Sequence, residues 1–70
     1  MLNDLATFAA RFNVSVADAY VLSAVFERSA EKVGMSKAAL VTEATYRNNK
    51  LGEYLAEVAR VVAAEDRKAA

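Results

Sequence analysis

Residues 34–41 read GMSKAALV and place a turn between two helices. Glycine readily adopts the left-handed backbone conformation that ends many helices, and Met35 follows where a Schellman closure folds back on the preceding helix. Ser36 is a good N-cap, and aliphatic residues follow it at helical positions. The stretch therefore predicts a helix that ends at Gly34 and another that begins after Ser36.

The helix before this turn extends from Ser15 to Val33 in our prediction. Ser15 is a good N-cap, and Asp18 lies three residues further on, in a variant of the capping box. The apolar residues that recur at helical spacing are Leu22, Val25, Phe26, Ala30 and Val33. This is the strongest helical pattern in the sequence.

Two helices are predicted after the turn. The first runs to about Asn48, where two consecutive asparagines break or bend it, and the second begins near Asn49 or Lys50. The second carries an apolar C-terminal stripe made of Leu51, Tyr54, Leu55, Val58 and Val62. The stripe predicts either homo-oligomer packing or a second protein partner bound through residues 50–70.

The pattern changes before Ser15. Ala10, Phe12 and Val14 alternate with polar residues, which predicts a short, half-buried strand. Residues 1–9 form either an N-terminal arm or a short amphipathic helix. The predicted fold is mainly α: one domain over residues 1–70, with a short N-terminal strand, a core over residues 10–48 and an extra C-terminal helix over residues 49–70.

Composition favours self-association. The chain has 70 residues, of which 56% are hydrophobic. A monomer of so short a chain buries too small a fraction of its surface to be very stable. It has no cysteine and no histidine, so it cannot form a disulfide or a zinc site of the usual kind. A dimer or larger assembly of identical chains is therefore expected.

The same composition argues against several function classes. Without cysteine or histidine there is no thiolate nucleophile and no imidazole base, and the carboxylates are spread at surface-like spacings, so we predict no enzyme, no cofactor and no metal. Nine basic and nine acidic residues cancel, so any nucleic-acid binding has to be local. The absence of a long apolar run or a signal-peptide pattern predicts a cytoplasmic protein with no membrane partner.

Two segments resemble the ribbon-helix-helix family of DNA-binding proteins, the group of the Arc, MetJ and CopG repressors. Residues 11–16, RFNVSV, resemble the ribbon of that family, and residues 34–41 resemble its turn and the start of its second helix. With the intervening helix, the resemblance covers about residues 10–48. The interval between ribbon and turn is longer than the family norm, which leaves the ribbon register open.

The resemblance implies a homodimer whose two-stranded ribbon enters the major groove of double-stranded DNA. Arg11, Asn13 and Ser15 would then face the bases, while Ser36 and Lys37 would hold phosphate. The implied dimer core consists of Phe12, Val14, Leu22, Phe26, Leu40 and Val41. The implied function is a small sequence-specific regulator, with repression, antitoxin action, plasmid partition and conjugative DNA processing all open.

Two alternatives remain. The chain also matches the helix, glycine turn and cap of a helix-turn-helix, through Ala30, Gly34, Met35 and Ser36. Glu43, however, falls at a position where that motif has a buried aliphatic residue. That mismatch ranks the helix-turn-helix below the ribbon. The alternative from another class is an all-helical protein-interaction module, such as an adaptor, inhibitor or assembly subunit, that binds no nucleic acid.

Overall fold

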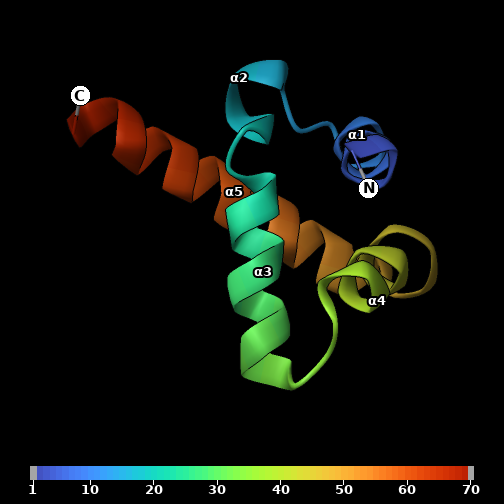
Figure 1. Ribbon diagram of the computed structural model, residues 1–70. Helices are drawn as coiled ribbons and strands as arrows, with labels where there is room; N and C mark the ends of the chain where they lie inside the picture. The colour runs from blue at the N-terminus through green and yellow to red at the C-terminus, as the bar shows by residue number, and fades with distance from the viewer. Residues whose placement is uncertain (1, 70) are drawn as a thin grey trace.

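The computed structural model describes residues 2–69, and every regular element in that range is a helix. The elements are α1 (Leu2–Arg11), α2 (Val16–Ala19), α3 (Leu22–Val33), α4 (Lys37–Thr42), the π-helix η1 (Glu43–Arg47) and α5 (Asn49–Ala69). Figure 1 shows α3 crossing α5, with α1 and α4 to one side and the C-terminal end of α5 projecting to the other. Within the described range, no helix is both long enough and apolar enough to cross a membrane.

The predicted N-terminal strand is wrong, because α1 occupies the start of this segment and a turn the rest. The amide of Phe12 donates to the Phe8 carbonyl at 3.0 Å, and the amide of Val14 donates to the Ala9 carbonyl at 2.9 Å. Asn13 then adopts the left-handed conformation, with φ of 58°. Residues 2–69 contain no strand to form a ribbon, so the ribbon-helix-helix fold is overturned.

The reason for this error is that two periodicities overlap in the same few residues. Phe8 and Phe12 lie four residues apart, which places them on one face of a helix, and their ring centroids are 4.8 Å apart. Phe8 also packs edge-on against Phe26 of α3, with centroids 4.9 Å apart. This packing of α1 on the core outweighs a five-residue alternation.

The helix predicted from Ser15 to Val33 is divided into α2 and α3. The Ser15 hydroxyl accepts a hydrogen bond from the Asp18 amide at 3.2 Å, as an N-cap does. The amide of Val21 then donates to the Asp18 carbonyl three residues back, which tightens the turn and ends α2. Val21, at the break, is 5% exposed and continues the buried stripe of Val25, whose amide donates to its carbonyl at 3.0 Å.

The structure has the predicted turn at Gly34. Gly34 has a φ of 72°, and the amide of Met35 donates to the Ala30 carbonyl at 3.0 Å. The Ser36 hydroxyl accepts from the Ala39 amide at 3.1 Å and caps α4. Because these contacts are all local, the sequence alone is enough to predict them.

The helix after the turn changes type at Glu43, where α4 gives way to η1. The amide of Asn48 donates to the Glu43 carbonyl at 2.8 Å, and this five-residue loop is wider than that of an α-helix. Thr45 keeps the buried position four residues after Val41 and is 2% exposed, whereas the wider turn leaves Arg47 outside. In a regular α-helix, residue 47 would fall on the stripe that includes Leu40.

α5 approaches the other helices closely because its buried face carries small residues. Ala56, Ala59 and Ala63 are at most 1% exposed. At Gly52, an added Cβ would lie 2.2 Å from Cζ of Phe12 and 2.5 Å from the carbonyl oxygen of Ala44. The start of α5 therefore rests directly on η1 and on the end of α1.

Candidate functional site

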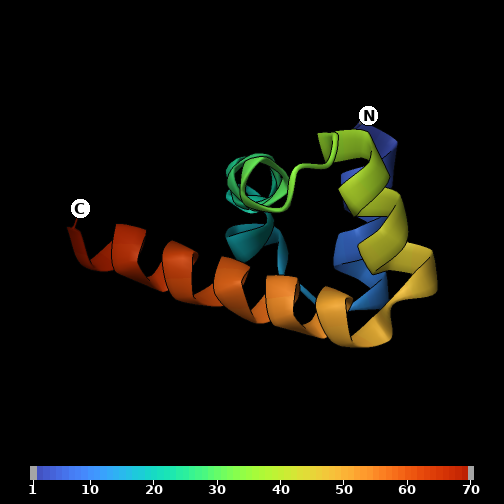
Figure 2. The same ribbon diagram turned by 90° about the horizontal axis from the view of Figure 1, so that it is seen from below.

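Helices α3 and α4 form a helix-turn-helix arrangement. The turn between them comprises residues 34–36, and Figure 2 shows α3 end-on with α4 beside it. Ala30 on α3 and Leu40 and Val41 on α4 are at most 5% exposed, so small and aliphatic side chains fill the contact region. α1 contacts both α4 and η1 and completes a three-helix unit. A second helix held this way is the element that enters the major groove in helix-turn-helix proteins.

The mismatch at Glu43 is resolved by the packing. Glu43 is half-buried at the point where α4 becomes η1, and Ala44 beside it has no exposed surface. Ala44 lies four residues after Leu40 and fills the inner position next to it. An acidic residue at position 43 is therefore compatible with this arrangement.

The outer face of α4 consists of small side chains. Ala38, Ala39 and Thr42 are exposed, and with Met35, Glu43 and Arg47 they line a surface hollow. Small side chains let the backbone of a helix come close to another surface, and alanine and threonine methyl groups make apolar contacts with thymine. This face can therefore approach base edges closely.

Charge is distributed unevenly along the chain. Residues 32–50, the basic segment, carry four basic side chains and one acidic one, for a net charge of +3. The rest of the chain has the other five basic and eight acidic residues, for a net charge of −3. The charged residues of the basic segment are Lys32, Lys37, Arg47, Lys50 and Glu43.

The residues predicted to contact bases lie outside the helix-turn-helix unit. Arg11 is exposed at the end of α1, and Asn13 is exposed in the turn that follows. Ser15 uses its hydroxyl to cap α2. No strand aligns these three residues, so the structure does not form the predicted base-reading surface.

The predicted phosphate contacts have partners within the chain. The Ser36 hydroxyl is engaged in the cap of α4. The Lys37 ammonium donates to the hydroxyl of Ser23, near the start of α3, which holds the starts of the two helices together. The Lys37 side chain therefore joins α3 to α4, in addition to contributing a positive charge.

The predicted dimer core is occupied within a single chain. Phe12 is half-buried against Phe8 and the start of α5. The other five residues are at most 7% exposed: Val14, Leu22, Phe26, Leu40 and Val41.

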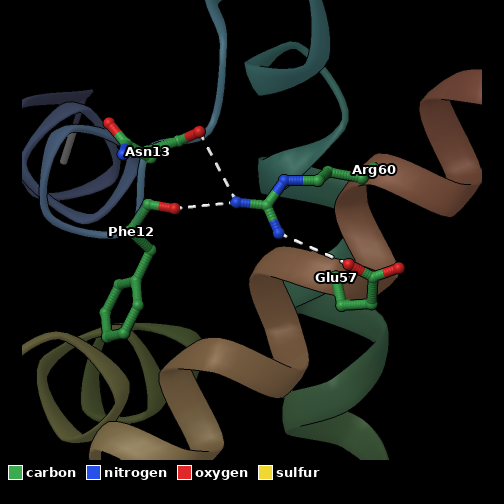
Figure 3. Close-up of polar contacts among 4 residues, drawn as sticks. All are labelled: Phe12, Asn13, Glu57 and Arg60. Atoms are coloured by element: carbon green, nitrogen blue, oxygen red, sulfur yellow. Dashed lines mark hydrogen bonds and ion pairs between the residues drawn. The ribbon is translucent and has the colours of Figure 1, made fainter.

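Arg60 of α5 fastens the turn that follows α1 (Figure 3). One guanidinium nitrogen, Nη2, donates to the carbonyl oxygens of Phe12 at 2.8 Å and Asn13 at 3.5 Å. The other, Nη1, lies 3.4 Å from the Glu57 carboxylate. These contacts satisfy carbonyls at the helix end, where no helical partner exists. Sequence reasoning missed this role, because Arg60 and Phe12 are 48 residues apart.

Arg60→Met is expected to lower the free energy of unfolding by about 1.5 kcal/mol, since it keeps much of the side-chain bulk but removes a charged hydrogen-bond donor. Urea denaturation measures the loss. Glu57→Gln is the matched control, because this exposed ion pair contributes about 0–1 kcal/mol. Equal losses in the two variants would show that the carbonyl contacts do not stabilise the turn.

Two contacts anchor the C-terminal end of α5 to the α2 region. The Arg67 guanidinium donates to the Asp18 carboxylate at 2.8 Å, and the Tyr20 hydroxyl donates to Asp66 at 3.2 Å. The Arg67 hydrogen bond lowers the pKa of Asp18 below its ordinary value. Burial, together with the hydrogen bond to Asp66, raises the pKa of Tyr20.

The Asp18 contact predicts a pH-dependent stability. A carboxyl group whose pKa is lower in the folded chain stabilises the fold above its unfolded-state pKa, and the contribution is lost as pH falls through the folded-state pKa. Asp18→Asn should therefore lower the melting temperature at neutral pH, and the deficit should vanish as pH falls below 3.8, the ordinary aspartate pKa. Arg67→Met should behave in the same way. A deficit that is constant with pH would contradict the assignment.

The C-terminal stripe is divided between the core and the surface. Leu55 is 1% exposed and belongs to the core, Leu51, Val58 and Val62 are half-buried, and Tyr54 is 64% exposed. The partly covered residues border a groove between α3 and α5 with a volume of about 340 Å³. The α3–α5 groove is lined by Val25, Arg28, Ser29, Lys32, Val33, Leu51, Tyr54, Leu55, Val58 and Val62.

A comparison of the chain with protein-family models, with curated proteins and with solved structures finds no match. Within residues 2–69, no group of three or more carboxylates is placed to hold a metal ion. The functional argument therefore depends on the α3–α4 unit and on the α3–α5 groove.

Proposed function

We propose that the protein is a small DNA-binding regulator that uses α3, the turn and α4 as a helix-turn-helix. The observation that carries the proposal is the concentration of a net +3 charge on residues 32–50, which contain the turn, α4 and η1, in a chain with no net charge. Phosphate attraction supplies most of the affinity of DNA-binding proteins, and a local cluster provides it without a basic chain. Such a regulator acts in the compartment that holds its DNA.

The outer face of α4 has a defined part in this proposal. Ala38 and Thr42 face the major groove, where their methyl groups favour thymine. Arg47, kept outside by the wide turn of η1, and Lys50, at the start of α5, face the phosphates. The helix reads bases, and the two basic side chains set its position on the duplex.

Duplex binding measured at several salt concentrations tests the phosphate contacts. Arg47→Ala should weaken binding to all duplexes alike and lower the slope of log affinity against log salt by about one unit. Lys68→Ala is the control, because it removes the same charge from the opposite end of α5. If the slope of log affinity against log salt changes equally in both variants, Arg47 does not make a specific phosphate contact.

A steric substitution tests the reading face. Ala38→Glu places a charged side chain on the outer face of α4 and should abolish duplex binding, with no change in helix content by circular dichroism. Ala64→Glu makes the same change at another exposed alanine, on α5, and should leave binding unchanged. If both variants bind as the wild type does, α4 does not enter the groove.

A second candidate function, the all-helical protein-interaction module, is favoured by one observation, the apolar α3–α5 groove. Duplex binding measured at several salt concentrations distinguishes the two functions. A wild-type chain with no salt-sensitive affinity for any duplex would exclude the regulator and leave the interaction module.

A further inference from the structure

α5 carries an apolar surface in addition to the one it buries. Tyr54 is 64% exposed, Val61 is 51% exposed, and Val58 between them is half-buried. The spacings of four and three residues in this α5 seam (Tyr54, Val58 and Val61) are those of a helix that packs along a second helix. The core takes a different face, made of Gly52, Leu55, Ala56, Ala59 and Ala63.

The α3–α5 groove beside the seam has a basic edge. Arg28 and Lys32 of α3 line it, and neither makes an ion pair or a side-chain hydrogen bond with any residue in the described part of the chain. Glu65 lies seven residues after Val58, two turns along the same side of α5. The groove therefore has two basic side chains at its edge, Arg28 and Lys32, that are unpaired within residues 2–69. The α5 seam is followed along the same side of the helix by an acidic side chain, Glu65.

Antiparallel pairing of two α5 helices brings the seams of two copies into contact and places Glu65 of each copy near the basic edge of the other. A two-fold axis at Val58 places Tyr54 of one copy opposite Val62 of the other. It also places Leu51 opposite Glu65, and Leu51 borders the groove together with Lys32. Apolar residues then meet in the middle, and the acidic side chain of each copy approaches the basic edge of the other.

We propose that a second copy of this chain occupies the α3–α5 groove, with the two α5 helices antiparallel about Val58. The exposed surface of the chain is consistent with this, since it measures 4689 Å². A monomer of this mass is expected to expose about 4,300 Å². The 21-residue α5 spans about 30 Å, enough for the roughly 800 Å² per partner that a stable interface buries. The α3–α5 groove does not include Ala38, Thr42, Arg47 or Lys50, the residues that the proposed function places on DNA.

Sedimentation equilibrium of the full chain over a wide concentration range tests the pairing. The wild type should approach twice the mass of one chain, and Tyr54→Asp should remain monomeric at concentrations where the wild type is dimeric. Tyr46→Asp is a matched control, because Tyr46 is 63% exposed on η1 and does not line the groove. Both variants alter exposed side chains, so circular dichroism should show wild-type helix content.

Charge reversal distinguishes a second copy from any other occupant. Lys32→Glu and Glu65→Lys should each raise the dimer dissociation constant roughly ten-fold, because two symmetric contacts become repulsive. The double variant should return it to near the wild-type value, which requires the two side chains to meet across copies.

Three results would overturn the proposal: a wild-type chain that stays monomeric, a dimer that survives Tyr54→Asp, and a double variant that remains weak. Duplex retention is measured separately on the same samples. If the wild-type chain is monomeric and binds DNA, the dimer proposal fails and the proposed function stands. If it is dimeric and does not bind DNA, the proposed function fails and the dimer proposal stands.

Discussion

Phe8→Ala is expected to lower the free energy of unfolding by about 3–5 kcal/mol, as truncation of a buried phenylalanine commonly does. Phe8 has no exposed surface, and its ring contacts those of Phe12 and Phe26. A domain of this size has a total stability of about 4–10 kcal/mol. The variant should therefore lose about a third or more of the total stability, which urea denaturation followed by circular dichroism measures directly.

Val16→Ala is the control for this experiment, because Val16 is 93% exposed at the start of α2. It should change the stability by no more than about 0.5 kcal/mol. If both variants lose stability equally, α1 is not part of the core, and residues 2–11 are an arm.

Gly52→Ala should destabilise the protein by about 3 kcal/mol, although alanine is the better helix former by about 1 kcal/mol. The added Cβ would lie 2.2 Å from Phe12 Cζ and 2.5 Å from the backbone oxygen of Ala44. A flexible ring can move aside, but a helix carbonyl cannot, so α5 has to shift away from η1. Thermal unfolding at equal concentrations measures the loss.

Gly34→Ala makes the same chemical change at the other glycine and separates crowding from backbone strain. A Cβ at this position meets nothing within 4 Å, and its cost arises only from the φ of 72°. The expected loss is about 1 kcal/mol. A Gly52→Ala variant that is as stable as Gly34→Ala, or more stable, would show that α5 has room to move.

The parts of the fold that the sequence predicts correctly depend on local chemistry. The caps at Ser15 and Ser36 and the left-handed Gly34 act within a few residues, so the ends of the helices could be located in advance. The strand at Phe12 was wrong because alternation and helical spacing are both satisfied there. Only the packing of Phe8 on Phe26, which is 18 residues further along, decides between them.

The site was harder to predict, because its contacts join distant parts of the chain. Arg60 and Phe12 are 48 residues apart, and Arg67 and Asp18 are 49 residues apart. The π-turn has no simple sequence signature, and without it the exposure of Arg47 could not be predicted. The turn at Gly34 and the cap at Ser36 were predicted from their own residues, but the half-buried position of Glu43 at the start of η1 was not.

The wide turn of η1 also bears on how this chain can change in evolution. A loop closed over five residues instead of four is equivalent to one residue inserted into an α-helix. Deleting one residue here would restore a regular helix and turn every later side chain by about a quarter of a turn relative to α4. Such a deletion would reorient α5 as a whole, together with Arg60 and the seam. Homologues are therefore expected to keep the length of this segment more strictly than the identity of its residues.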